Sequence, residues 1–341
     1  GATWEQIHGL GPVIPAGGPP WWQDRRAELQ RIAHEHGSAY VYHRASSELA
    51  ARQLLAIRGV DRIFYAMKAN PHPELLKTFA GLGLSFECVS RGECEHVMQV
   101  VPGIDPSRIL FTPNFAPRSE YEWALEQGVN LTIDNVYALR EWGELFRDRD
   151  VLIRIDTGFG RGHHDHVRTA GVHSKFGVPL FEMDEVERLV NLVGARVVAL
   201  HAHTGSGVFD VRNWKEVGHM LGGLAQRFPH ARAIDLGGGL GVPEKPGQVP
   251  VDLAALQGVI DDIRAKWPQV ELWLEPGRFL VAQGGVLVVE VTQLKGKGAV
   301  QYVGVSTGMN SLIRPALYGA HHDIVNFSFN GTATTEIYTV V

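Results

Sequence analysis

The chain has 341 residues, of which 45% are hydrophobic and 20% are charged, and its formal net charge is -5 at pH 7. This composition is that of an ordinary globular protein, and the length exceeds that of one small domain. The negative charge offers no basic field for nucleic acid or an anionic membrane, and no apolar run approaches the roughly 20 residues that span a bilayer. We therefore expect neither a nucleic-acid partner nor a membrane partner.

The cysteines and the first residues of the chain indicate in which cellular compartment we expect the protein. Cys88 and Cys94 are the only cysteines, and their spacing suits neither a disulfide framework nor a CxxC motif. Residues 1–5 have neither the basic start nor the apolar core of a signal peptide. We therefore expect reduced thiols and a cytoplasmic protein. Because the chain does not begin with Met, we also expect it to be processed, excised or tagged.

The first part of the chain, residues 1–43, predicts a loop, a helix and a strand. Residues 9–20 are rich in Gly and Pro, which favours a loop. Apolar residues at helical spacing predict a helix over 21–36, ended by Gly37. Residues 39–42 predict a short strand.

From residue 44 to residue 284, short apolar strands alternate with amphipathic helices. The predicted strands are 63–66, 85–88, 109–111, 131–133, 151–155, 197–203, 233–236 and 271–275. The predicted helices are 47–57, 74–81, 92–100, 117–126, 135–146, 183–192, 211–227 and 253–266. This alternation predicts parallel strands with right-handed crossovers, and eight such units fit an α/β fold of the (β/α)8 barrel type. A doubly wound open sheet is the alternative.

After Gly284 and Gly285 the pattern changes. The runs 286–291, 300–305 and 335–341 are rich in β-branched residues, with no helix predicted between them. We expect a second, all-β domain over 285–341, completed by the N-terminal segment 1–43. The last run ends without a turn, so we expect the native chain to continue.

Lys68 is the first candidate for chemistry. It lies in Tyr65-Ala66-Met67-Lys68-Ala69-Asn70, where prolines 71 and 73 end a buried strand. A desolvated lysine favours the neutral amine, which is the nucleophile that forms Schiff bases. Taken alone, such a lysine more often packs its stem and keeps its ammonium group in water.

In a barrel the active site lies at the C-terminal ends of the strands, so the residues there test this idea. The polar or glycine-rich residues at those ends are Glu87, Asp134, Arg154, Asp156, His201–Gly207, Gly237–Gly239 and Glu275–Arg278. An amine, glycine-rich loops and an arginine at neighbouring strand ends indicate a Schiff-base site for a phosphate-bearing cofactor.

The glycine turn and its neighbours each have a structural alternative. Bare backbone N–H groups of Gly237, Gly238 and Gly239 suit a phosphate, although a tight turn with positive φ needs glycine too. Arg278 suits phosphate as well, or a surface ion pair. His203 can stack on an aromatic cofactor or be a core histidine, which is how we interpret His201.

Two histidine pairs raise the question of a metal. His163-His164 and His321-His322 lack the HExxH or carboxylate spacing of zinc sites. We therefore expect no metal.

Seven segments together resemble one family: Tyr65–Asn70, Phe86–Glu93, Ser174–Gly177, His201–Gly207, Asp235–Gly239, Glu275–Arg278 and Arg314–Tyr318. Over nearly the whole chain it is similar to the pyridoxal-phosphate decarboxylases of the alanine-racemase-like barrel type, most closely to diaminopimelate decarboxylases. The resemblance implies that pyridoxal 5'-phosphate is bound to Lys68 as a Schiff base, with His203 stacked on its ring and Glu87 orienting the site. It implies phosphate binding by Ser206, Gly237, Gly238, Gly239 and Arg278, and places Arg154 and Gly277 among the cofactor-binding residues.

The same resemblance implies a reaction. Glu275 at the pyridine nitrogen keeps the ring a strong electron sink and favours decarboxylation, whereas the family's racemases place an arginine there. Arg278, Arg314 and Tyr318 are implied to bind the distal end of meso-2,6-diaminopimelate, whose carboxylate suits a guanidinium. The products would be L-lysine and CO2, in the last step of lysine biosynthesis.

Several alternatives stay open. They are a decarboxylase of ornithine, arginine or carboxynorspermidine, a non-catalytic pyridoxal-phosphate barrel, and a Schiff-base aldolase without cofactor.

The family pattern departs from this chain at its end. The family continues with a Gly-Pro-x-Cys-Glu-Ser segment and a later tyrosine, part of which reaches the partner's site and implies a homodimer. Nothing follows Val341 here. We expect this chain alone to bind cofactor but to decarboxylate poorly. The start without Met also resembles a module of a bifunctional aspartate kinase–decarboxylase.

Overall fold

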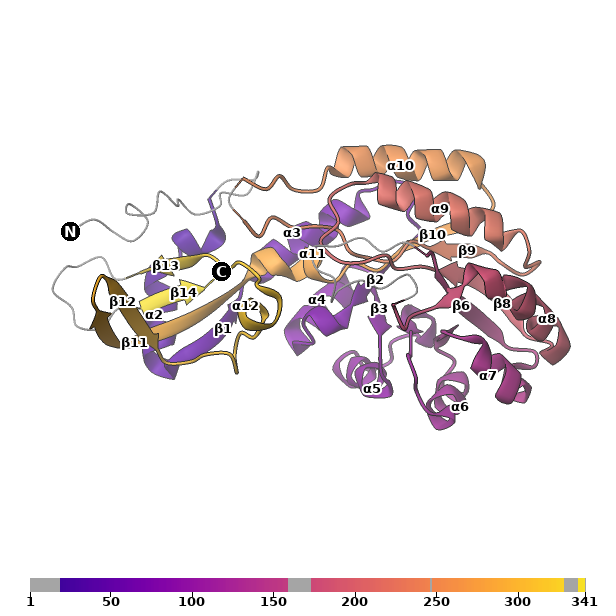
Figure 1. Cartoon of the computed structure of the whole chain (residues 1–341), viewed down its shortest axis with the longest axis horizontal. Coiled ribbons are helices and arrows are strands. Elements are labelled where there is room, and N and C mark those ends of the chain that lie inside the picture. The colour runs from indigo at the N-terminus through magenta and orange to yellow at the C-terminus, as the bar shows by residue number, and fades with distance from the viewer. Residues whose placement is uncertain (1–18, 159–172, 246, 328–336, 341) are drawn as a thin grey trace. The chain divides into compact units, whose positions relative to one another are not determined.

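The computed structural model describes residues 19–158, 173–245, 247–327 and 337–340. Most of the loop predicted over 9–20 and the pair His163-His164 lie outside these ranges. The chain divides into two compact units. The barrel unit comprises 47–241 and 251–281, and the sheet unit comprises 1–46, 242–250 and 282–341. Figure 1 traces both along the chain.

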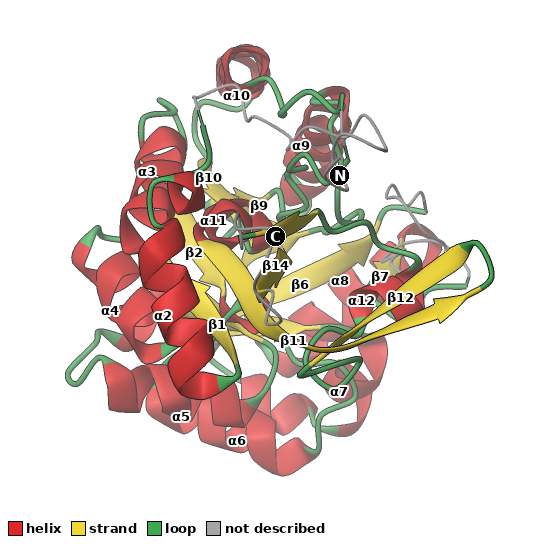
Figure 2. Ribbon diagram, turned by 90° about the vertical axis from the view of Figure 1, so that its left-hand side faces the viewer, coloured by secondary structure: helices red, strands yellow, loops and turns green. Residues whose placement is uncertain are grey.

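Eight parallel strands close the barrel, and Figure 2 shows helices around its strands. The ring runs through hydrogen-bonded neighbours and closes where β10 pairs with β2 and β5 pairs with β6. This confirms the predicted (β/α)8 fold. The strands are β2 (Arg62–Ala66), β3 (Ser85–Cys88), β4 (Ile109–Phe111), β5 (Asn130–Ile133), β6 (Asp150–Asp156), β8 (Arg196–His201), β9 (Ala233–Asp235) and β10 (Glu271–Leu274), with the short β7 (Val178–Pro179) beside β6.

Each of the eight helices predicted around the barrel is present. They are α3 (Arg44–Leu55), α4 (Pro73–Gly81), α5 (Arg91–Val100), α6 (Arg118–Gln127), α7 (Val136–Glu141), α8 (Met183–Val193), α9 (Arg212–Ala225) and α10 (Leu253–Lys266). Short 3-10 turns are η2 (Met67–Ala69), η3 (Pro106–Arg108), η4 (Gly143–Phe146) and η6 (Leu180–Glu182), and α11 (Arg278–Val281) follows β10.

One predicted helix, over 135–146, is divided in the structure. α7 ends at Glu141, and η4 begins at Gly143. A Cβ on Gly143 would lie only 2.4 Å from Cγ1 of Val193, at the end of α8. The break therefore coincides with a close approach between two neighbouring helices, which a local pattern does not reveal.

The barrel has an inner and an outer core because side chains alternate along a strand. On β2, Ile63 and Tyr65 face the helices, whereas Phe64 belongs to a separate cluster inside the barrel. The rings of Phe64 and Trp273 lie 5.2 Å apart there. The rest of this inner cluster is Leu110 on β4, Leu152 on β6, Val198 and Ala199 on β8, and Ala233 on β9.

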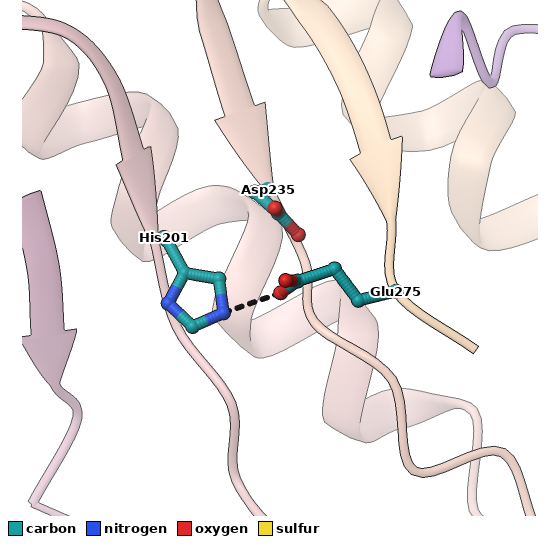
Figure 3. A group of neighbouring side chains, drawn as sticks. All are labelled: His201, Asp235 and Glu275. Carbon is teal, nitrogen blue, oxygen red and sulfur yellow. Dashed lines mark ion pairs between the residues drawn. The ribbon is translucent and has the colours of Figure 1, made fainter. Parts of the chain in front are cut away.

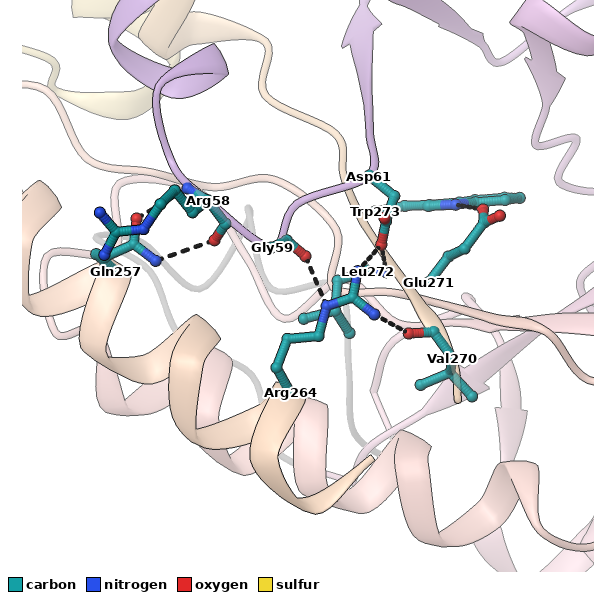
Figure 4. A network of polar contacts seen from close by, with 9 residues as sticks. All are labelled: Arg58, Gly59, Asp61, Gln257, Arg264, Val270, Glu271, Leu272 and Trp273. Atoms are coloured by element: carbon teal, nitrogen blue, oxygen red, sulfur yellow. Dashed lines mark hydrogen bonds and ion pairs between the residues drawn. The ribbon is translucent and has the colours of Figure 1, made fainter. Parts of the chain in front are cut away.

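A polar network centred on Arg264 of α10 ties together the N-terminal ends of the first and last strands of the barrel (Figure 4). Arg264 Nε donates to Gly59 O at 3.1 Å, and its Nη1 donates to Val270 O at 2.6 Å. Its Nη2 pairs with the carboxylate of Asp61, which also accepts the N–H of Leu272 at 2.8 Å. The segments entering β2 and β10 are thus held by one guanidinium.

The sheet unit is built on an antiparallel sheet in the order β1-β11-β14-β13. Its strands are β1 (Ser38–Tyr42), β11 (Gly285–Lys297), β13 (Ile324–Asn326) and β14 (Ile337–Val340), and β12 (Val300–Val305) extends β11 as a hairpin. β1 pairs with β11 from Ser38↔Val289 to Tyr42↔Gly285. The N-terminal strand therefore completes the C-terminal sheet, as expected.

This unit is not purely β. The 3-10 turn η1 (Trp21–Gln23) and helix α2 (Arg26–His36) bury Trp22, Leu29 and Ala33 in one cluster with sheet residues. Between the strands lie η7 (Ala282–Gly284) and α12 (Arg314–Tyr318), neither of which was predicted. α12 has proline in its first turn and ends at Gly319, with φ +62°. Five residues are too few for a periodic signal.

Within the described ranges, no helix combines the length and the apolar character needed to cross a membrane.

Replacing Arg264 with alanine should lower the free energy of unfolding by about 2 kcal/mol, because two carbonyls lose a charged donor and Asp61 loses its cation. Urea unfolding of both proteins measures the difference. Arg188→Ala is a matched control, since Arg188 and its partner Glu185 lie at the surface and such a pair contributes little to stability. Equal losses in the two variants would contradict the role of the network.

Candidate cofactor and substrate site

A cavity of about 590 Å³ opens at the C-terminal ends of the barrel strands. Its size is that of a small-molecule site. It collects residues from the ends of seven barrel strands, β2, β3, β4, β6, β8, β9 and β10. Those that the sequence singled out are Lys68, Glu87, Arg154, His203, Ser206, Glu275, Gly277 and Arg278. A smaller cleft of about 250 Å³ is lined by Arg62 and Arg108, both of which donate to backbone carbonyls.

Lys68 lies in η2, directly after β2. The hydroxyl of Tyr65 donates to Asn70 O at 2.8 Å and holds the turn, while Ala66 N–H donates to Pro276 O at 3.0 Å. The strand therefore ends in a turn, as predicted. The Lys68 side chain is exposed into the cavity and not desolvated, so it is accessible to a ligand.

Glu87 ends β3 and is buried beside this amine. It accepts a hydrogen bond from the hydroxyl of Thr112. Burial raises the pKa of Glu87, and the positive charge of Lys68 opposes that rise. The pair thus places a carboxyl group next to the candidate nucleophile.

Glu275 follows β10 and pairs with His201 at the end of β8, at 2.5 Å from Nε2 to Oε2 (Figure 3). Burial alone raises the pKa of a carboxyl group, but the pairing with His201, together with the charge of Lys68, lowers the pKa of Glu275 to about 2. Asp235, at the end of β9, lies beside them. Glu275 is therefore an ionised carboxylate at the cavity wall.

The three glycines after β9 are pressed against other loops. A Cβ would lie 2.4 Å from Ala202 O at Gly237, 2.1 Å from Glu275 O at Gly238 and 2.1 Å from Gly205 O at Gly239. φ is +71° at Gly237 and +87° at Gly239. The N–H of Gly237 donates to Asp235 at 2.9 Å, and that of Gly238 donates to His203 Nδ1 at 3.3 Å. Phosphate binding by this turn stays a prediction.

His203 is oriented by that bond. Since Nδ1 accepts a backbone N–H, the ring proton of the neutral imidazole is on Nε2. Burial, together with the charges of Lys68 and Arg154, holds the pKa of His203 well below its usual value. A neutral, half-buried ring at the cavity wall suits stacking on an aromatic ligand.

Arg154 is buried near the end of β6, with its guanidinium 4.5 Å from the ring centre of Phe176. Burial lowers its pKa, and the charge of Asp134 opposes this. Arg278 opens α11 and Ser206 lies in the loop after β8; both are half-buried at the cavity. These two groups could hold a phosphate.

The sequence reasoning missed Thr112 and Asn114, which follow β4 and line the cavity. Asn114 donates to Asp134, and its buried Oδ1 has no hydrogen-bond partner among the described residues. Lys175 and Phe176 were noted only within a motif. The signal for the first two was present, because the strand-end rule applies to residues after 109–111 as well.

Arg314 and Tyr318 lie on α12 in the sheet unit. Arg314 donates to Glu244 Oε1 at 2.9 Å, and its Nη1 lies 3.2 Å from His322 Nε2. His321 bonds Asp323 at 2.8 Å. The histidine pair is thus occupied by Arg314 and Asp323, and binding of substrate by Arg314 and Tyr318 stays a prediction.

His201, Asp235 and Glu275 are the one group of metal-ligand residue types found within the described ranges. Their ligand atoms all lie within 4.8 Å of one another. The imidazole and one carboxylate already pair together, which a metal would disrupt. The expected absence of a metal stays a prediction.

The residues present fit pyridoxal 5'-phosphate. An accessible lysine, an ionised carboxylate, a neutral imidazole face and an arginine surround one cavity. Lys68 would hold the cofactor covalently, Glu275 would bind its ring nitrogen, and Arg278 with Ser206 would bind its phosphate. These residues follow three strands of one barrel, β2, β8 and β10.

Comparisons with known proteins agree. Residues 44–282 match the family "Pyridoxal-dependent decarboxylase, pyridoxal binding domain". The chain therefore belongs to the pyridoxal-dependent decarboxylases, and pyridoxal 5'-phosphate is its cofactor. Within that family its relatives are the diaminopimelate decarboxylases.

Three of these relatives show how much of this chain and of each relative the similarity covers. The Streptomyces coelicolor enzyme is 34% identical over 304 residues, which cover 87% of this chain and 68% of that protein. The Escherichia coli K12 enzyme is 30% identical over 321 residues (92% and 76%), and the Methanothermobacter thermautotrophicus enzyme is 33% identical over 276 residues (77% and 64%). The chain thus spans about two thirds to three quarters of their length.

Solved structures give the same fold. A diaminopimelate decarboxylase that is 30% identical matches with a TM-score of 0.80 over 88% of this chain and 73% of its own. The Helicobacter pylori enzyme complexed with L-lysine is 23% identical, with a TM-score of 0.82 over 91% and 87%. The second likeness concerns the fold alone.

Proposed function

We propose that this chain carries the site for pyridoxal-phosphate-dependent decarboxylation of meso-2,6-diaminopimelate to L-lysine and CO2, the last step of lysine biosynthesis. The observation that carries the proposal is the meeting of an accessible Lys68 amine and an ionised, buried Glu275 in one cavity. The bound cofactor supplies an electron sink for the carbanion left when CO2 departs. The relatives at 30–34% identity support this choice of reaction.

We assign a separate role in cofactor binding to each residue of the site. Lys68 would hold the cofactor covalently, with Glu87 beside it as a carboxyl group of raised pKa. Glu275 would keep the ring nitrogen protonated, because an ionised carboxylate stabilises a protonated pyridine. His203 would cover one face of the ring, and Arg278 with Ser206 would hold the phosphate.

Substrate choice rests on the distal end of diaminopimelate. A carboxylate there suits the guanidinium groups of Arg278 and Arg314, with Tyr318 as a further hydrogen-bond donor. Contacts with Glu244 and His322 already hold the guanidinium group of Arg314 in a defined orientation. A decarboxylase of ornithine or arginine would instead need an acidic group for a distal cation.

The other readings have less support. Glu275 occupies the place where a racemase would have arginine, and a cofactor-free aldolase would have no use for Arg278 and Ser206. A non-catalytic pyridoxal-phosphate barrel would have no use for the arginine and tyrosine of α12.

Borohydride reduction of the cofactor-loaded protein should abolish its visible absorption band and leave a phosphopyridoxyl group on Lys68, identified by peptide mapping. Lys68→Ala should form no adduct and lose about a thousandfold or more of the lysine-forming rate. Lys175→Ala removes another amine from the same cavity and should keep the adduct. A reduced adduct on any residue other than Lys68 would refute the assignment.

In a panel of diaminopimelate, ornithine, arginine and lysine, kcat/KM should be highest for diaminopimelate by about a hundredfold. Arg314→Ala should raise KM for diaminopimelate by about tenfold to a hundredfold, since a charged hydrogen bond contributes about 1.5–3 kcal/mol. Arg188→Ala, on α8, is the control. Turnover of ornithine at a rate comparable to that of diaminopimelate would contradict the substrate assignment.

We also propose a homodimer with active sites near the subunit interface, and a cytoplasmic location. The implied exchange of a segment between subunits supports the dimer, and the reduced pair Cys88 and Cys94 supports the compartment. Light scattering should give twice the 37.5 kDa mass of the chain. A single-chain mass at micromolar concentration would count against the dimer.

A further inference from the structure

The ends of β8, β9 and β10 bring His201, Asp235 and Glu275 together, as Figure 3 shows. Their exposed fractions are 2%, 0% and 7%. The sequence predicts a core histidine at His201; its Nε2 lies 2.5 Å from Glu275 Oε2, and it lines the cavity. Its surroundings are therefore polar and belong to the site.

The two carboxyl groups of this trio differ in the hydrogen bonds that they receive. Glu275 receives the Nε2–H of His201. Asp235 Oδ1 receives the N–H of Gly237 at 2.9 Å, whereas no donor reaches its buried Oδ2 within the described part of the chain. Buried His201 Nδ1 has no partner there either. The three side chains thus hold one strongly bonded carboxylate and one poorly bonded carboxyl group.

Two carboxyl groups this close in a buried site do not both ionise readily, because like charges repel and neither is solvated. The environment decides which one keeps the proton. Glu275 has a donor on His201, and its pKa falls to about 2. Burial and the negative charge of Glu275 raise the pKa of Asp235 well above its usual value. The proton therefore stays on Asp235.

We propose that His201 and Asp235 are positioning residues for Glu275, with His201 donating to its carboxylate and Asp235 lying beside it as a neutral acid. This inference rests on the proposed function, in which Glu275 meets the ring nitrogen of the cofactor. A carboxylate anchored through one oxygen presents the other to that nitrogen in a fixed direction. A neutral Asp235 adds no second negative charge that would have to be compensated.

Other charged and titratable groups face this trio from neighbouring elements. They are Lys68 in η2, Glu87 on β3, Asp134 after β5, Arg154 on β6 and His203 after β8. All of them are unchanged by the substitutions below. A change in the cofactor spectrum of the variants is therefore assigned to the trio.

The test uses the cofactor-loaded full chain, with pyridoxal phosphate labelled at its ring nitrogen and observed by nuclear magnetic resonance across neutral pH. The wild type should show a protonated ring nitrogen. His201→Ala should lower the pH at which that nitrogen loses its proton and reduce kcat about tenfold to a hundredfold, with KM for diaminopimelate changed less than about threefold. His201→Gln keeps an N–H at similar reach and should recover most of both quantities.

Asp235→Asn tests the protonation state. An amide replaces a neutral acid without a change of charge, so the ring-nitrogen signal should titrate as in the wild type. Removing an ionised Asp235 would instead take away a negative charge and shift that titration. A shifted titration in Asp235→Asn overturns the proposal. Circular dichroism shows whether His201→Ala folds, and if it does not, the Asp235→Asn variant still tests the proposal.

His219→Ala is the matched control. His219 also pairs with a carboxylate, at 2.7 Å from Asp262, but it lies on α9 outside the cavity. It should leave the ring-nitrogen signal unchanged. An unchanged signal and kcat in a folded His201→Ala would overturn the role of His201. Failure of the proposed function would look different, because the wild type itself would then bind no cofactor on Lys68.

Discussion

The candidate site depends on closure of the barrel between its first strand and its last. Lys68 follows β2 and Glu275 follows β10, and the two strands pair in parallel through Trp273↔Arg62 and Leu274↔Ile63. The N–H of Ala66 then donates to Pro276 O at 3.0 Å, beyond the paired residues. At the opposite end, the Arg264 network holds the segments that enter these strands. The nucleophile and the carboxylate meet because about 200 residues between them complete the ring.

Closure of the barrel also brings several carboxyl groups close together, and their surroundings give them different pKa values. Glu275 pairs with His201 and has a depressed pKa, whereas Glu87 and Asp235 are buried with raised pKa values. Three carboxyl groups at one end of a barrel can thus hold different protonation states at the same pH. A decarboxylase site needs such a difference, because one group must stay charged while another can carry a proton.

Much of this arrangement was predictable, because local patterns mark strand ends. All eight strands of the barrel were predicted, and so was the turn at Lys68. The division between α7 and η4 was not predicted, and it coincides with a close approach of Gly143 to Val193, which is distant in sequence. The pairing of His201 with Glu275 also depends on register between strands. A short motif shows which residues reach the strand ends, but not which of them touch.

The division into units has a consequence for how the molecule can be taken apart. The segment 242–250 leaves the barrel after β9 and belongs to the sheet unit, where Glu244 bonds Arg314, before α10 resumes the barrel. With the joins near residues 46 and 281, the backbone passes between the two units four times. Neither unit is one continuous stretch, so no single protease cut or gene truncation can release either of them whole.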